Sequence, residues 1–235
     1  MKRIILTVIT AMLLGGNLAW ADDSEDAIAA YNHKDYATAL KIWRQLATEG
    51  NAPAQAYIGM LHAQGQGVPQ DYTTAAQWFE KAAAQGYAAA QFTLGVLYAN
   101  GNGVPQNYVK ARQWVEKAAI QGNAPAQYNL AQMYARGEGV PQDYVKARQW
   151  YKQAAANGDA EAQVLLGVMY LGGYGVPQDY MRAYMWYSLA AASTGDQQTH
   201  AADGQDRAAR RMAPAQIAEA QRFTRQCQTK QFKGC

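Results

Sequence analysis

The sequence predicts an all-α fold, a solenoid built from 36-residue helix-turn-helix repeats. Three short strings recur with this one period, and a period between about 20 and 50 residues indicates stacked structural units. The string Gly-Val-Pro-Gln-Asp/Asn-Tyr begins at Gly67, Gly103, Gly139 and Gly175. An Ala-Gln pair begins at Ala54, Ala90, Ala126 and Ala162, and an Ala-Ala pair begins at Ala82, Ala118, Ala154 and Ala190.

The first helix of each repeat is predicted from apolar residues that fall on one helical face. In the second repeat these residues are Ala90, Leu94, Leu97 and Tyr98, with spacings i, i+4, i+7 and i+8. A glycine-rich turn follows, because Gly101 and Gly103 allow backbone angles that other residues avoid. A polar residue then precedes the second helix and can accept hydrogen bonds from its first turn. These predicted N-caps are Asp71, Asn107, Asp143 and Asp179.

The second helix is predicted to bury Ala111, Trp114, Ala118 and Ala119 and to end at Gly122. The tryptophans recur every 36 residues, so we interpret them as structural. They are Trp78, Trp114, Trp150 and Trp186. Small residues at one position of the first helix allow a close helix approach. These are Gly59, Gly95, Ala131 and Gly167.

The repeats resemble those of the Sel-one-like repeat family, a relative of the tetratricopeptide repeats. Its pattern AxAQxxLGxxYxxGxGVxxDxxKAxxWxxKAAxxG matches residues 50–194 in four units. The resemblance implies a right-handed α-α superhelix whose concave face recognises partners. The departures are Ala131 for glycine, His62 for tyrosine, Asn107 for aspartate and Thr194 for the final glycine.

The N-terminus is predicted to direct export. Lys2 and Arg3 precede an apolar run from Ile4 to Leu14 and small residues around Ala19 and Ala21, as in a secretory signal peptide. The alternative is a short membrane anchor, although the run is much shorter than a membrane span. Without Lys2 and Arg3 the chain has 19 basic and 18 acidic residues, a net charge of +1. This balance argues against nucleic-acid binding. From the predicted signal peptide we expect a periplasmic protein, or alternatively a secreted or surface-associated one.

The expected organisation follows the repeats, with an atypical unit at each end. The segments are a signal peptide at 1–21, a degenerate capping helix pair at 22–49, repeats at 50–86, 87–122, 123–158 and 159–194, and C-terminal capping helices at 195–235. Ile217, Ala220 and Phe223 are predicted to cover the fourth repeat. The basic stretch from Arg207 is interpreted as a solvated helix face, with an anionic-partner patch as the alternative.

No catalytic, cofactor or metal site is predicted. Ser24, Ser188 and Ser193 lie in neither a GxSxG nor an SxxK motif. Cysteine-rich relatives of the family are described as β-lactam hydrolases, but this chain lacks a cysteine pair in each repeat. His62 is interpreted as a core substitution, because His33 and His200 are not at metal-ligand spacing from it. An enzyme acting on the cell wall remains the least favoured hypothesis.

Protein binding is the favoured function, with a secreted host-interaction factor as the alternative and a monomer expected in either case. Aromatic and weakly charged side chains suit a protein or peptide contact, and positions that vary between first helices are candidates for it. These candidates are Tyr57, Met60, Thr93, Val96, Asn129, Gln132, Leu165 and Val168. Packing between repeats is the alternative role for Met60, Val96 and Val168. Cys227 and Cys235 are the only cysteines, and we expect them to form a disulfide after export.

Overall fold

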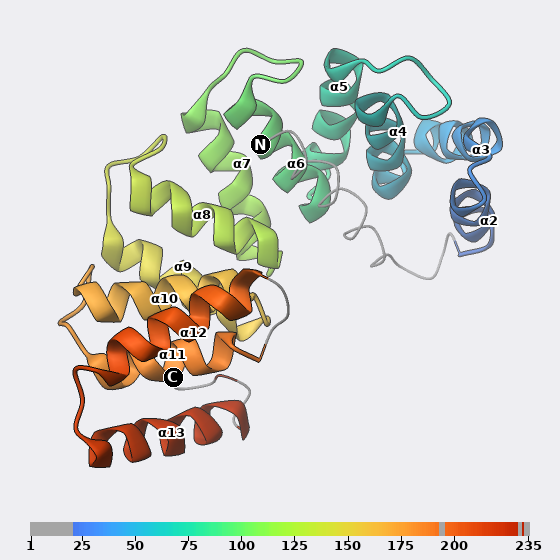
Figure 1. Cartoon of the computed structure of the whole chain (residues 1–235). Helices are drawn as coiled ribbons and strands as arrows, with labels where there is room; N and C mark the ends of the chain where they lie inside the picture. The colour runs from blue at the N-terminus through green and yellow to red at the C-terminus, as the bar shows by residue number, and fades with distance from the viewer. Residues whose placement is uncertain (1–20, 193–195, 230–231, 233–235) are drawn as a thin grey trace. The chain divides into compact units, whose positions relative to one another are not determined.

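A computed structural model describes residues 21–192, 196–229 and 232 (Figure 1). Every regular element in these residues is an α-helix, which confirms the predicted all-α repeat fold. The chain divides into two compact units between Asn123 and Ala124. The predicted signal peptide lies outside the described residues, apart from Ala21.

The first unit consists of three helix pairs, and consecutive helices pack against one another. The leading pair is α2 (Ala21–Asn32) and α3 (Tyr36–Thr48). Two repeats follow, and we call the first helix of each repeat its A helix and the second its B helix. They are α4 (Ala52–Gln64) with α5 (Tyr72–Ala84), and α6 (Ala88–Asn100) with α7 (Tyr108–Ile120).

The second unit contains two further repeats and two terminal helices. The repeats are α8 (Ala124–Arg136) with α9 (Tyr144–Ala156), and α10 (Ala160–Gly172) with α11 (Tyr180–Ala190). The terminal helices are α12 (Asp196–Ala209), which packs against α10 and α11, and α13 (Pro214–Thr229), which packs against α11. These consecutive contacts fit a repeat superhelix. Among the described residues, no helix has the length and apolar character needed to span a bilayer.

The turn between α6 and α7 shows how the repeated string fixes each hairpin. Gly101 ends α6 in the left-handed conformation with φ of 70°. Gly103 also has a positive φ of 71°, and a Cβ there would lie 2.1 Å from the carbonyl oxygen of Tyr72. Gln106 Nε2 donates to the carbonyl oxygen of Ala99 at 2.8 Å and so satisfies the end of the A helix. The same bond joins Gln70 to Ala63, Gln142 to Ala135 and Gln178 to Leu171.

The predicted N-caps of the B helices are confirmed. The side chains of Asp71, Asn107, Asp143 and Asp179 each accept a hydrogen bond from a backbone N–H in the first turn of the helix, at 2.8 to 3.2 Å. At the start of α6, Tyr87 makes no such side-chain bond.

The predicted close approach is confirmed at Gly59, Gly95 and Gly167, where it lies between the two helices of one repeat. A Cβ on Gly95 would lie 2.6 Å from Cγ2 of Val115 and 3.0 Å from the carbonyl oxygen of Ala111. Both of these residues belong to α7, the B helix of the same repeat. Glycine at this position therefore sets the distance between the two helices of one repeat.

The four repeated tryptophans are buried to different extents, and Trp78 and Trp114 pack against the core without being fully buried in it. Trp186 is buried, whereas Trp78, Trp114 and Trp150 are only partly buried. The core position is the next residue along each B helix, about 100° further around the helix axis. In all four repeats this residue is buried, and its occupants are Phe79, Val115, Tyr151 and Tyr187.

The two ends of the chain differ from the prediction in detail. Helix α2 begins at Ala21, the last residue assigned to the predicted signal peptide. At the other end, α13 buries Ala220, Thr224 and Cys227, whereas Phe223 is 46% exposed. The predicted covering role of Phe223 is therefore wrong, because α13 turns a face of small residues toward its neighbours. Cys235 lies outside the described residues, so its pairing with Cys227 stays a prediction.

Candidate partner-binding surfaces

Two of the eight predicted partner-binding residues lie in the core of the first unit. Tyr57 is 6% exposed and Met60 is 1% exposed. Trp43 of α3 stacks on the Tyr57 ring with a centroid distance of 4.4 Å and an interplanar angle of 1°. Burial raises the pKa of the Tyr57 hydroxyl above its ordinary value. The leading helix pair thus covers this position, and neither residue can contact a partner in this structure.

The other two predicted residues of the first unit, Thr93 and Val96, are partly exposed on α6. Thr93 directs its hydroxyl to the carbonyl oxygen of Ala89, one turn earlier, at 2.9 Å. Val96 lies three residues later on the same side of the helix and is also partly exposed. Because the Thr93 hydroxyl donates within its own helix, this part of α6 presents mainly aliphatic atoms to solvent.

In the second unit, polar residues occupy the same positions of α8. Asn129 Nδ2 donates to the carbonyl oxygen of Pro125 at 2.9 Å. Gln132 Nε2 donates to the hydroxyl of Tyr128, and the Tyr128 hydroxyl makes a further hydrogen bond with Glu161 at the start of α10. Burial raises the pKa of Tyr128, and the bond to Glu161 raises it further. A polar chain from Gln132 through Tyr128 to Glu161 therefore links the two A helices.

The corresponding residues of α10 are aliphatic. Leu165 is partly buried, and Val168 is 39% exposed. Val164 and Leu171 are also partly exposed, and their spacing places them on the same face of the helix. The second unit thus carries an amide-rich region on α8 and an aliphatic region on α10, the next A helix along the chain. Tyr128 and Glu161, which the sequence did not single out, connect the two regions.

The described residues contain no cluster typical of a metal site. No group of three or more His, Cys, Asp or Glu side chains in this part of the chain could hold a metal ion. Ser188 directs its hydroxyl to the carbonyl oxygen of Tyr184 at 2.8 Å and accepts from Gln205 Nε2 at 2.9 Å. The Ser188 side chain therefore serves helix packing.

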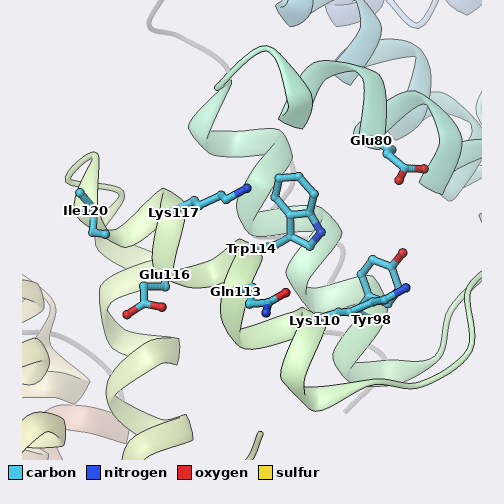
Figure 2. Close-up of a pocket in the computed structure, with 8 residues that line it drawn as sticks. All are labelled: Glu80, Tyr98, Lys110, Gln113, Trp114, Glu116, Lys117 and Ile120. Carbon is cyan, nitrogen blue, oxygen red and sulfur yellow. The ribbon is translucent and has the colours of Figure 1, made fainter. Parts of the chain in front are cut away.

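A pocket of about 460 Å³ lies elsewhere in the first unit, against α7 (Figure 2). Tyr98 of α6 and Glu80 of α5 contribute to its wall, and the remaining lining residues come from α7. The α7 residues are Lys110, Gln113, Trp114, Glu116, Lys117 and Ile120. The sequence prediction missed this pocket, because two of its side chains come from helices other than α7.

The two pocket lysines are held by aromatic rings. The Lys117 ammonium lies 4.2 Å from the centroid of the Trp114 ring, and the Lys110 ammonium lies 5.2 Å from that of Tyr98. Figure 2 shows the Lys117 ammonium directed toward the indole, whereas the Glu116 carboxylate points away from it. The Glu116 carboxylate pairs with Arg112 at 2.6 Å.

Comparison with known proteins identifies the repeat itself. The chain matches the family model described as Sel1 repeat in four consecutive segments, residues 52–87, 88–123, 124–159 and 160–194. These segments make up more than half of the chain. No curated protein matches the chain.

Solved structures share the fold over most of the chain. A protective antigen present in uropathogenic Escherichia coli strains, which displays an SLR fold, is 34% identical with a TM-score of 0.74 over 84% of this chain. The chain spans only 45% of that protein's length. A Sel1 repeat protein from Oxalobacter formigenes is 33% identical with a TM-score of 0.71, covering 81% of this chain and 83% of that one. A sel1 repeat protein from Klebsiella pneumoniae subsp. pneumoniae is 22% identical with a TM-score of 0.50, covering 80% of this chain and 91% of that one. At this identity the likeness shows the fold alone.

Proposed function

Because this chain belongs to the Sel1 repeat family, whose repeats generally form non-catalytic scaffolds for protein interactions, we propose that it is a protein-binding scaffold of the bacterial periplasm or envelope. It binds a protein or peptide partner along the A helices and needs no cofactor. The predicted signal peptide supports the proposed compartment.

The observation that carries the proposal is a contrast between buried and exposed positions of the A helices. The buried apolar positions keep an apolar residue from repeat to repeat, as at Ile58, Leu94, Leu130 and Leu166. The exposed positions change their chemistry instead. Thr93 is followed by Asn129 and Leu165, and Val96 is followed by Gln132 and Val168. A fixed core with a variable surface is what recognition of a particular partner requires.

The second unit also favours a particular kind of partner segment. Side-chain amides on α8 can bond to a peptide backbone, and the aliphatic side chains of α10 can bury an apolar anchor. The Glu161 carboxylate accepts from Tyr128, which fixes the ring between the two regions. We therefore expect an extended segment with an apolar residue that reaches Val168.

Photocrosslinking tests this assignment. Val168 and Val145 are both exposed valines, at 39% and 47%, but Val168 lies on an A helix and Val145 on a B helix. Benzoylphenylalanine replaces each valine in turn, and crosslinking is carried out in intact cells. We expect a discrete crosslinked protein from position 168 and none from position 145. The same product from both positions, or a product from position 145 alone, would contradict an A-helix binding surface.

A second candidate function is that of a secreted or surface-associated factor that contacts host proteins. The similarity to a protective antigen of uropathogenic Escherichia coli favours it, because a protective antigen is met by the immune system. Cell fractionation separates the two proposals. Recovery in the periplasmic fraction supports the envelope scaffold, and recovery in the culture medium or on the cell surface supports the host-directed factor.

A further inference from the structure

The pocket on α7 lies apart from the proposed A-helix surface and has its own chemistry. Its volume of about 460 Å³ is within the range of ligand sites in proteins. Five of its eight lining residues carry charged or amide side chains, and the other three are Tyr98, Trp114 and Ile120. Ile120 is 71% exposed, so an apolar side chain stands at the rim of the pocket.

The charges of the pocket leave two cations available. Glu116 is neutralised by Arg112, and among the described residues no carboxylate pairs with Lys110 or Lys117. The aromatic rings hold both ammonium groups in place, which lowers the entropy lost when a ligand binds them. Lys110 and Lys117 are seven residues apart on one helix, a rise of about 10 Å. This spacing exceeds what one carboxylate can bridge but suits two acidic side chains of one peptide.

This combination occurs in the second repeat alone. The first repeat has threonine in place of Lys110 and alanine in place of Ile120, and the third has glutamine in place of Lys117. The equivalent residues are Thr74, Lys81 and Ala84 in the first repeat, Lys146, Gln153 and Ala156 in the third, and Arg182, Leu189 and Ala192 in the fourth. This set of lining side chains is therefore particular to the second repeat.

We propose that this pocket binds an acidic peptide segment of a partner protein. Two carboxylates of the segment pair with Lys110 and Lys117, and an apolar side chain between them packs on Trp114. The apolar lining from Trp114 and Ile120 suits a peptide side chain and offers nothing to a sugar-phosphate backbone, which disfavours nucleic acid. Lys117 covers one face of the Trp114 indole, where the ring of a bound sugar would stack, which disfavours a glycan.

Fluorescence anisotropy with the full chain tests the proposal. The probe is a fluorescein-labelled peptide Glu-Asp-Leu-Leu-Glu-Asp, and its neutral analogue is Gln-Asn-Leu-Leu-Gln-Asn. The acidic peptide should bind more tightly than the neutral one, and added salt should weaken its binding. The double variant Lys110→Gln, Lys117→Gln should bind it about fivefold more weakly, because exposed ion pairs each contribute modestly.

Lys81→Gln is the matched control, because the Lys81 ammonium lies over Trp78 at the same 4.2 Å but outside the pocket. It should leave peptide binding unchanged, whereas Ile120→Asp should weaken it by charge repulsion. Thermal melting by circular dichroism establishes that each variant is folded. Equal binding of the neutral peptide, no binding of the acidic peptide, or an equal loss in Lys81→Gln would overturn the proposal. A chitin-derived tetrasaccharide that binds Lys110→Gln, Lys117→Gln as well as it binds the natural chain would identify a glycan site instead.

Discussion

The side-chain amide of Gln121, at the end of α7, donates a 2.8 Å hydrogen bond to Oε1 of the buried Gln91 in α6. Gln91 Nε2 in turn donates to the carbonyl oxygen of Ala83 in the preceding repeat, at 3.1 Å. One buried side chain therefore joins the two helices of its own repeat to the repeat before it. Similar bonds reach Gln55 from Gln85 and Gln127 from Asn157, at 2.8 and 2.9 Å.

Replacement of Gln91 should therefore weaken the connection between repeats. Gln91→Met keeps the approximate volume but removes both hydrogen bonds, so we expect a loss of about 2 kcal/mol in the free energy of unfolding. Gln77→Met is the control, because Gln77 is exposed on α5. It should change stability by no more than about 0.5 kcal/mol. Urea denaturation measures both, and equal effects would show that the buried amide is unimportant.

The second glycine of the turn should be irreplaceable for a reason beyond its backbone angle. Gly103 and Gly86 both have positive φ, but a Cβ would meet the backbone of Tyr72 at Gly103 and nothing within 4 Å at Gly86. Gly86→Ala should cost about 1 kcal/mol for the left-handed conformation alone. Gly103→Ala should cost about 2 kcal/mol more, because the two segments must separate. Chemical denaturation of the two variants makes the comparison, and equal losses would exclude the close approach.

Substitution of Tyr57 should destabilise the fold, in contrast to what an exposed binding residue would do. Tyr57→Ala removes the ring stacked on Trp43 and leaves a cavity, so we expect a loss of about 3 kcal/mol. Thr93→Ala, at the equivalent and partly exposed position of the next repeat, should cost less than about 1 kcal/mol. Thermal melting compares the variants. Unchanged stability in Tyr57→Ala would mean that α3 does not cover this residue in solution.

His62 should make stability depend on pH near neutrality. Burial lowers the pKa of His62, Arg44 lowers it further, and Asp71 partly opposes them. The Nδ1 atom is buried and has no hydrogen-bond partner among the described residues. The unfolded chain therefore binds the proton more readily, and stability is complete above a pH of about 6.5 and falls as the pH drops toward the lowered pKa. The pH range from 5.5 to 7.5 extends about one unit to either side of the unfolded pKa of histidine. Urea denaturation across this range should show the free energy of unfolding rising with pH.

The matched variant for this test is His62→Tyr, which restores the residue found at Tyr98, Tyr134 and Tyr170. It should reduce the pH slope in this range. An undiminished slope would assign the effect to another group.

The predicted disulfide has a direct chemical test. Cys227 is buried on α13, and the only other cysteine is Cys235. Thiol titration of the native, unreduced, exported protein should find no free thiol, and reduction should release two. Two free thiols before reduction would exclude the pair.

The repeats and their turns could be predicted because their chemistry is local. Asp71 and its three equivalents cap the helix that follows them, and the left-handed glycines end the helix that precedes them. Each of these interactions spans a few residues, so the sequence order already contains it. The stripe of small residues was also readable, because only close packing explains Gly95 inside a helix.

The exposure of single side chains could not be predicted in the same way. Trp114 and Val115 belong to the same repeated string, and a common period cannot tell which of two adjacent residues faces the core. The sequence places Tyr57 at the same repeat position as Thr93 and Asn129, and it does not reveal that Trp43 of α3 stacks on the Tyr57 ring and buries it. The pocket on α7 depends on Glu80 from another repeat, a contact that no local pattern contains.

Binding of the partner by the A helices has a direct thermodynamic test. Isothermal titration calorimetry with the protein crosslinked at position 168 measures it, using Val168→Glu and Val145→Glu as a matched pair. We predict about tenfold weaker binding for Val168→Glu, because a carboxylate replaces an apolar contact at the centre of the interface. Val145→Glu should bind as the natural chain does. Equal affinities for all three proteins, or a loss confined to Val145→Glu, would contradict the claim.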